Sequence, residues 1–177
     1  MRKSTAFVPL IVSALGLLPC AQPASAAGSG DTPVTIQVTS GTLDITVPAG
    51  PVSLGTVAAS SSAQTVSGQL GNVEVIDSRG GTTGWTATAS AVDFTGPSSI
   101  SVSAPGSSSY TTPAATVTGT ANVTPSNLTA LYPPAPVQTA TGVAGINTAT
   151  WDPTISVTLP ADTEAGTYSS TVTHSVS

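Results

Sequence analysis

The sequence predicts an all-β protein, and three observations predict it. After residue 26, good helix-forming residues are scarce, whereas the β-branched residues Val, Ile and Thr are abundant. Apolar residues recur at every second position in many short runs, which is the period of a half-buried strand. Glycines and prolines lie between the runs and predict turns. We therefore expect a single antiparallel β-sandwich with Greek-key connections and long Pro/Thr/Ala-rich loops.

The first 26 residues have the pattern of a cleaved, helical secretory signal peptide. Met1-Arg2-Lys3 gives a positive start, residues 6–18 form an apolar stretch, and Ala24-Ser25-Ala26 is a small-residue cleavage site. The apolar stretch is too short for a stable membrane span, which takes about 20 residues. A lipoprotein acylated at Cys20 is the alternative. We expect cleavage after residue 26, which leaves one domain over residues 27–177.

The composition excludes several classes of partner. Of the 177 residues, 55 are Ser or Thr and only 11 are charged. After the leader the chain contains one basic residue, Arg79, and eight acidic residues. Its net charge is therefore −7 when His174 is neutral. Nucleic-acid binding and attachment to anionic lipid both need clusters of basic side chains, so both are excluded. Because no cysteine follows the leader, we expect a packed core to stabilise the domain without disulfides.

The alternating runs define the expected strands in chain order. Residues 34–38 and 43–47 alternate Val, Ile and Leu with Thr, Gln and Asp, and residues 155–159 repeat the pattern near the other end. Residues 106–113 and 125–148 show no such alternation, so we expect them to be irregular loops. The expected strands are 34–38, 43–47, 72–77, 85–92, 99–103, 115–124, 155–159 and 168–176.

Residues 155–176 are expected to form a hairpin. One strand covers 155–159, the corner covers 160–166, and the return strand covers 168–176. Tyr168 follows Gly166 by two residues at this acidic corner, a position that resembles the tyrosine corner of Greek-key, immunoglobulin-like sandwiches. In such a corner the tyrosine hydroxyl bonds to the backbone upstream, so we expect Tyr168 to be structural.

Two stretches of the chain have the form of signature motifs. They are Val75-Ile76-Asp77-Ser78-Arg79-Gly80-Gly81 with Gly84-Trp85-Thr86-Ala87, and Ile155 through Leu159-Pro160 and Gly166-Thr167-Tyr168 to Val172-Thr173-His174. These stretches resemble the motifs of WxL-type surface domains, and the resemblance covers roughly residues 34–177. The match is to a divergent member, because no leucine follows Trp85 in the first motif and His174 stands where the family usually has tryptophan. The resemblance implies a secreted, non-catalytic β-sandwich on the surface of Gram-positive bacteria, held non-covalently to peptidoglycan or to partner proteins.

Asp77 and Arg79 are expected to form a structural ion pair. Side chains two residues apart on a strand point to the same side, and such a pair contributes about 0–1 kcal/mol if it is exposed. The alternative is that Arg79 holds a ligand carboxylate through two hydrogen bonds. Trp85 shares its face with Ala87 and Ala89, so we expect its ring to fill the core.

The sequence predicts no catalytic centre, no metal and no cofactor. His174 alternates in step with Val172 and Val176, so we expect it to face the core or its margin. One histidine without cysteine cannot supply the usual ligands of zinc. The acids are scattered singly except for Asp162 and Glu164, and that pair lacks the Asp-x-Asp-x-Asp loop of a calcium site.

Binding is expected to depend on a few exposed aromatic residues. Trp151 follows the longer loop, and Tyr110 and Tyr132 lie in the two stretches expected to be irregular. The negative charge would repel anionic wall polymers, so attachment should use hydrogen bonds and stacking. The favoured function is a secreted module that associates with cell-wall glycan. The alternative is a structural or assembly subunit whose strand edges pair with other copies or with other surface proteins.

Overall fold

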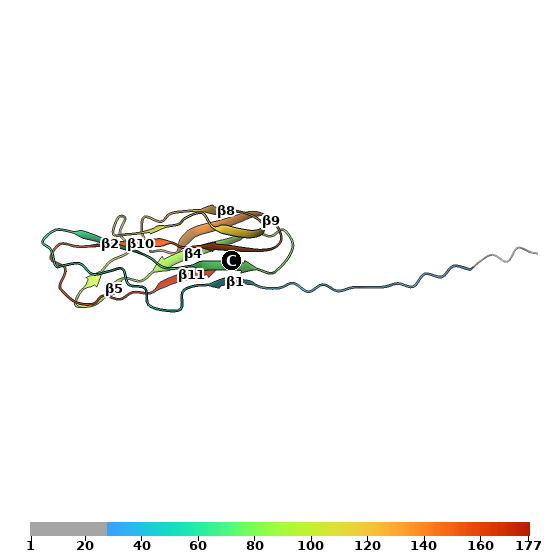
Figure 1. The fold of residues 1–177 in the computed structure, drawn as a ribbon, viewed down its shortest axis with the longest axis horizontal. Helices are drawn as coiled ribbons and strands as arrows, with labels where there is room; N and C mark the ends of the chain where they lie inside the picture. The colour runs from blue at the N-terminus through green and yellow to red at the C-terminus, as the bar shows by residue number, and fades with distance from the viewer. Residues whose placement is uncertain (1–27) are drawn as a thin grey trace, which may run out of the picture. The chain divides into compact units, whose positions relative to one another are not determined.

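The computed structural model describes residues 28–177, which contain strands and no helix (Figure 1). The predicted leader lies outside the described residues. Residues 28–37 belong to a different unit from residues 38–177 and contain no strand. Within residues 28–177 there is therefore no helix long and apolar enough to cross a bilayer.

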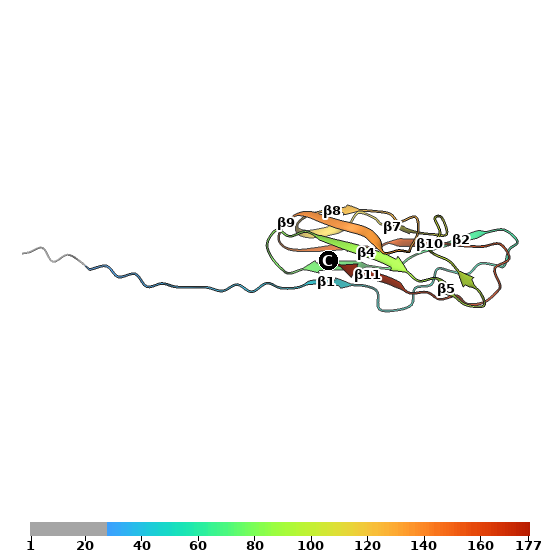
Figure 2. The same ribbon diagram turned by 180° about the vertical axis from the view of Figure 1, so that it is seen from behind.

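The described residues form three sheets, whose paired strands are antiparallel. The largest sheet has six strands, the second has three and the third has two. Figures 1 and 2 show the strands from opposite sides. The strands are β1 (Leu43–Thr46), β2 (Gln64–Gln69), β3 (Val73–Asp77), β4 (Trp85–Ala91), β5 (Phe94–Thr95), β6 (Ser99–Ile100), β7 (Ser108–Thr111), β8 (Thr116–Pro125), β9 (Ala135–Trp151), β10 (Thr154–Leu159) and β11 (Val172–Val176). The first sheet has the order β1-β3-β9-β4-β11 with β8 also on β9, the second is β2-β10-β7, and the third is β5-β6.

Strand β9 is the centre of the six-stranded sheet. It has 17 residues, and β8 pairs with it along residues 138–150. On its other edge β4 pairs with residues 135–140 and β3 with residues 147–151. The outer strands β1 and β11 pair with β3 and β4 respectively. Strand β9 therefore holds the motif-bearing strands β3 and β4 in one sheet.

The core forms where the period-two pattern predicts it. Residues of β3 and β4 alternate between buried and half-buried, and Trp85, Ala87 and Ala89 are all buried, as predicted. The wide ring of Trp85 stands opposite the small Ala140 on β9. Tyr110 of β7 and Ile155 of β10 belong to the same cluster, so side chains of the two larger sheets share one core. Each large apolar side chain buried there contributes about 1.5–3 kcal/mol.

Several predicted strands are confirmed and one is wrong. Strands occur at the predicted positions 43–47, 72–77, 85–92, 115–124 and 155–159, with ends that differ by one or two residues. At 99–103 and 168–176 the strands are shorter than predicted, because they cover only β6 and β11. The prediction at 34–38 is wrong: Val34, Ile36 and Val38 are 89%, 91% and 87% exposed, and no strand forms there.

The two stretches predicted to be irregular loops contain strands. Strand β7 lies within residues 106–113, and most of β9 lies within residues 125–148. In β9 the alternation is interrupted by Gly142 and Gly145, which have positive φ angles of 59° and 80°. The pairing with β8 changes register near these glycines, as expected at β-bulges. A bulge shifts the alternation of side chains by one residue, so a bulged, glycine-containing strand does not show a regular period of two in its sequence.

The prediction of a C-terminal hairpin is wrong. Strand β10 belongs to the three-stranded sheet, whereas β11 pairs with β4 in the six-stranded sheet. Residues 160–171 thus carry the chain from one sheet to the other. Alternation marks each strand but does not say which partner it chooses, and a crossover and a hairpin present the same local pattern.

Gly84 provides a test of the close packing between β4 and β9. A Cβ atom at Gly84 would meet the carbonyl oxygen of Ala140, whereas at Gly50 nothing lies within 4 Å. We expect Gly84→Ala to lower the free energy of unfolding by about 1–3 kcal/mol, because backbone must move. Urea denaturation followed by tryptophan fluorescence measures the change. Gly50→Ala is the matched control and should change stability by less than about 0.5 kcal/mol; an equal effect of both variants would contradict the packing argument.

Candidate functional site

The carboxylate of Asp77 is buried at the end of β3 and is paired with Arg79. Asp77 is 2% exposed. Arg79 Nε donates to Oδ1 at 2.9 Å, Nη2 donates to Oδ2 at 3.0 Å, and the Arg79 backbone N–H donates to Oδ1 at 3.1 Å. These hydrogen bonds from Arg79 lower the pKa of Asp77 below its usual value, against the opposing effect of burial. The pair therefore has the two-pronged geometry in which Arg binds a carboxylate most strongly.

The ion pair continues into a network that ties together three strands. Arg79 Nη2 also donates to the carbonyl oxygens of Thr83 and Gly84, at 3.2 and 3.1 Å, and so closes the turn before β4. On β9, Asn147 Nδ2 donates to Asp77 Oδ2 at 3.4 Å. The Trp85 indole N–H donates to Asn147 Oδ1 at 3.1 Å. The Nε–Nη2 edge of Arg79, which would bind a ligand carboxylate in the alternative hypothesis, is occupied by Asp77.

A second polar network contains the only histidine. Tyr110 is fully buried, its hydroxyl oxygen lies 2.8 Å from His174 Nε2, and Trp151 Nε1 donates to that oxygen at 3.3 Å. An indole N–H only donates, so the Tyr110 oxygen accepts from Trp151 and the hydroxyl proton points to His174. Nε2 is then the acceptor, which assigns the neutral histidine with its proton on Nδ1. Burial lowers the pKa of His174 to about 4 and raises the pKa of Tyr110.

Two of the three predicted ligand-contact residues are wrong. Trp151 is 3% exposed and Tyr110 is 0% exposed, so neither ring can stack on a ligand. The sequence predicts both in loops or at loop ends, but they lie on β9 and β7 with their side chains in the core. Tyr132 is 57% exposed and is the one candidate contact residue that the structure places at the surface.

Tyr168 makes the hydrogen bond expected of a tyrosine corner. Its hydroxyl donates to the carbonyl oxygen of Glu164, four residues upstream, at 2.8 Å. Because that proton is used, the hydroxyl of Ser98, 2.9 Å away, donates to the Tyr168 oxygen. Tyr168 thereby links the corner after β10 to the β5–β6 turn. The structural role predicted for Tyr168 agrees with these contacts.

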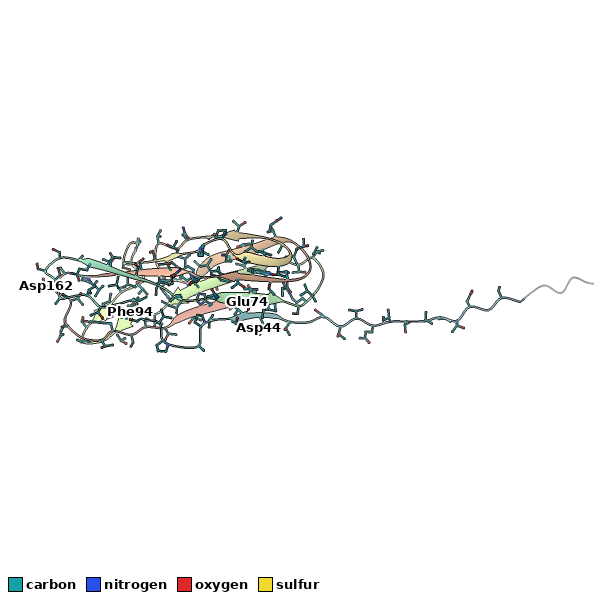
Figure 3. All side chains as sticks on the ribbon, viewed as in Figure 1. Asp44, Glu74, Phe94 and Asp162 are labelled. Atoms are coloured by element: carbon teal, nitrogen blue, oxygen red, sulfur yellow. The ribbon has the colours of Figure 1, made fainter. Side chains whose placement is uncertain are left out.

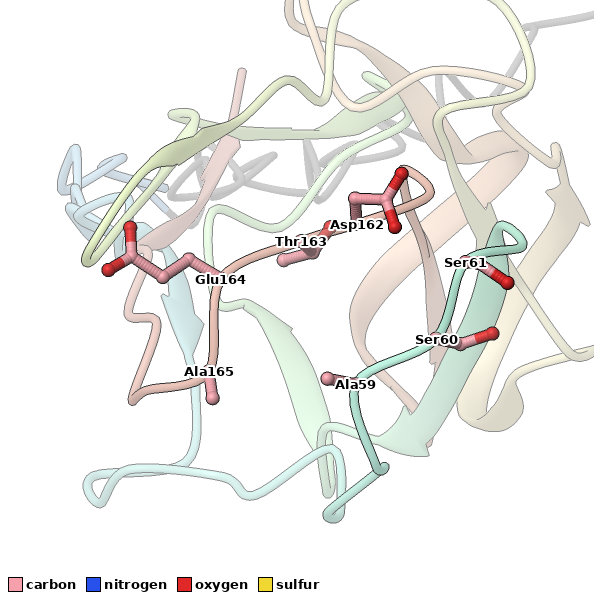
Figure 4. Close-up of a pocket in the computed structure, with 7 residues that line it drawn as sticks. All are labelled: Ala59, Ser60, Ser61, Asp162, Thr163, Glu164 and Ala165. Atoms are coloured by element: carbon pink, nitrogen blue, oxygen red, sulfur yellow. The ribbon is translucent and has the colours of Figure 1, made fainter.

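The acidic corner does not assemble a metal site within residues 28–177. Asp162, with φ of 58°, and Glu164 border a shallow hollow of about 420 Å³ together with residues 59–61 (Figure 4). Figure 4 shows their carboxylates pointing away from each other. Asp162 lies at the opposite end of the folded part from Asp44 and Glu74 in Figure 3. No group of three or more His, Cys, Asp or Glu is close enough to hold a metal in this part of the chain.

A second hollow, which sequence inspection missed, is lined by hydroxyl-bearing residues. It has a volume of about 400 Å³ and lies over the sheet β2-β10-β7. Its residues come from four separate stretches of the chain, so only the fold brings them together, and a sequence pattern would not have indicated it. None of them is charged. They are Thr65, Gly106, Ser108, Ser109, Thr129, Ser156 and Thr158.

Comparisons with known proteins give no match. No protein-family model, no curated protein and no solved structure matches the chain. Inferences about function therefore depend on the residues and contacts described above.

Because the Asp77 carboxylate is buried, we expect removal of Arg79 to lower stability more than removal of one partner of an exposed ion pair would. Arg79→Ala should lower the free energy of unfolding by about 2–3 kcal/mol, because it leaves the Asp77 carboxylate buried without a partner. Arg79 is one quarter exposed, so the loss should be smaller than for a fully buried pair. Urea denaturation at pH 7 measures it. Asp44→Asn, at an exposed acid, is the control and should be nearly neutral; similar stability of the two variants would contradict the network.

His174 predicts a decline of stability in mild acid. Its pKa is lower in the folded protein, about 4, than the ordinary value of 6.5. As the pH falls, His174 therefore binds a proton in the unfolded chain before it does so in the folded protein. The contribution of neutral His174 to the free energy of unfolding is complete above pH 6.5 and is lost between pH 6.5 and 4. We expect a loss of about 2–3 kcal/mol over this window. Denaturant unfolding at half-unit pH steps measures it.

His174→Gln is the matched variant for this pH dependence. Glutamine offers an oxygen that accepts the Tyr110 hydrogen bond but does not titrate. The decline between pH 6.5 and 4 should disappear in His174→Gln, while the separate loss below pH 3.8 due to Asp77 should remain. An unchanged pH profile in this variant would exclude His174 as the cause.

Proposed function

We propose that this chain is a secreted, non-catalytic protein of the bacterial cell surface that associates non-covalently with cell-wall glycan. The observation that carries the proposal is the uncharged, hydroxyl-lined hollow over β2, β10 and β7. Hydroxyl groups both donate and accept hydrogen bonds, so a cluster of them suits a neutral, hydroxyl-rich polymer. Tyr132, exposed on the surface, supplies a ring on which a sugar can stack.

The non-catalytic part of the proposal is supported by how the reactive side chains are used. Nucleophilic catalysis needs a base beside the nucleophile, and the only histidine uses Nε2 to accept a hydrogen bond from buried Tyr110. The Asp77 carboxylate is buried against Arg79. These groups hold strands together, and their exposure to a substrate would require those contacts to break.

The cellular setting in this proposal is supported by the leader pattern and by the WxL-like motifs. Asp77, Arg79 and Trp85, which carry the first motif, belong to one network through Asn147. We also propose that the two larger sheets face each other as a Greek-key β-sandwich, which the core they share supports.

An assembly subunit is the second candidate function, and one observation favours it. Residues 34–38 have the alternation of a strand but lie exposed, without a pairing partner within the described residues. Exposed segments of this kind form intermolecular sheets.

A sedimentation assay with purified cell walls tests glycan association. The protein should sediment with intact walls, should be released by glycan hydrolase, and should remain bound in 0.5–1 M salt because uncharged groups make the contacts. A Ser109→Ala/Thr129→Ala double variant and Tyr132→Ala should each weaken binding several-fold. Thr173→Ala, an exposed hydroxyl on β11, is the control and should bind like the parent. Binding that collapses in salt, or that both variants leave unchanged, would contradict the proposal.

A further inference from the structure

Residues 33–40 form an uncharged segment with the pattern of a strand. The sequence is Pro-Val-Thr-Ile-Gln-Val-Thr-Ser, in which Val34, Ile36 and Val38 alternate with Thr35 and Gln37. The three apolar side chains are 87–91% exposed, and they are the most exposed of the large apolar residues in the described part of the chain. β-Branched residues in strict alternation favour a half-buried strand. The segment therefore has one apolar face, and the side chains on that face are exposed.

Strand β8 is the longest edge strand in the described residues, and β-bulges interrupt its pairing with β9 between Gly119 and Asn122. It has ten residues, against four to six in the other edge strands β1, β2, β7 and β11. One edge of β8 pairs with β9, and no strand of the described part pairs with the other. Val117 and Val123 of β8 are half-buried against the core. A strand added at this edge would extend the same apolar layer.

Charge does not oppose contact between copies at these two places. The net charge after the leader is −7, so copies repel one another in general. Neither residues 33–40 nor β8 contains a charged residue. Natural edge strands are commonly protected by charged side chains, and β8 has none. The two uncharged, strand-compatible elements are therefore suited to pair with each other across copies.

We propose that residues 33–40 of one copy add as a strand to the free edge of β8 in a second copy. The added strand places Val34, Ile36 and Val38 on the side of Val117 and Val123, and its backbone groups pair with those of β8. The donor and acceptor are different surfaces, so the contact is heterologous and can continue from copy to copy into a chain or close into a ring. This inference deepens the second candidate function, an assembly subunit, and does not depend on glycan association.

Sedimentation velocity of the purified full-length chain, from micromolar to millimolar concentration, tests the association. We expect reversible, concentration-dependent growth beyond the monomer. Ile36→Asp should weaken the association about tenfold or more, because it puts a charge on the face that is buried. Gln37→Asp adds the same charge on the opposite face and is the matched control, with a change of less than about threefold. A monomer at every concentration, or equal effects of the two variants, would overturn the proposal.

Cysteine cross-linking locates the acceptor edge. In a Cys20→Ala background the chain has no cysteine. A copy with Ile36→Cys is mixed with a second copy that carries either Val117→Cys or Val123→Cys on β8. A copy with Thr173→Cys on β11 replaces the second copy as the control. Same-face neighbours on adjacent strands have Cβ atoms about 4.5–5.5 Å apart, near enough for a disulfide after small adjustment. Under mild oxidation we expect mixed dimers with Val117→Cys or Val123→Cys and none with Thr173→Cys.

The outcomes separate this proposal from the proposed function. Mixed dimers with the control alone, or with none of the three copies, would overturn the assignment of β8. Ile36→Asp should bind purified walls as the parent does, since Ile36 lies outside the hydroxyl-lined hollow. Loss of self-association with wall binding retained supports the strand addition. Failure of wall binding with self-association retained would contradict glycan association and leave the strand addition standing.

Discussion

A buried carboxylate is stable only when its charge is paired and its oxygens accept hydrogen bonds. Asp77, on β3 of the six-stranded sheet, is such a carboxylate. Arg79, just after the end of β3, meets this requirement with two side-chain hydrogen bonds. Asn147 brings β9 to the same carboxylate, and through it Trp85 on β4. One ion pair therefore positions three strands and the turn between two of them.

The Tyr110 network performs a similar task between the two larger sheets. Tyr110 belongs to the sheet β2-β10-β7, whereas Trp151 and His174 belong to the six-stranded sheet. Three polar groups that would each be costly to bury alone satisfy one another here. The Asp77 carboxylate, the Tyr110 hydroxyl and the His174 ring are thus all used in contacts within the fold.

The candidate site was predictable from sequence where local geometry determines it. Asp77 and Arg79 are two residues apart, so their side chains can meet within one local segment whatever the rest of the fold does, and they do so in the turn that follows β3. Trp151 and Tyr110 were assigned to the surface wrongly, because their exposure depends on distant strands that cover them. The hydroxyl-lined hollow had no sequence signal, since its residues come from separate stretches and serine and threonine are common throughout the chain.

The sequence by itself determined the all-β class, five of the strands and the apolar face of β3 and β4, because period two and turn residues are local properties. Tertiary structure alone decided the partner of each strand. It sent β10 and β11 to different sheets, and it made β9 a continuous strand across two positive-φ glycines. It also left residues 34–38 unpaired although their pattern is that of a strand. Alternation shows that a segment can bury one face, but only the packed fold decides whether a surface is present to bury it against.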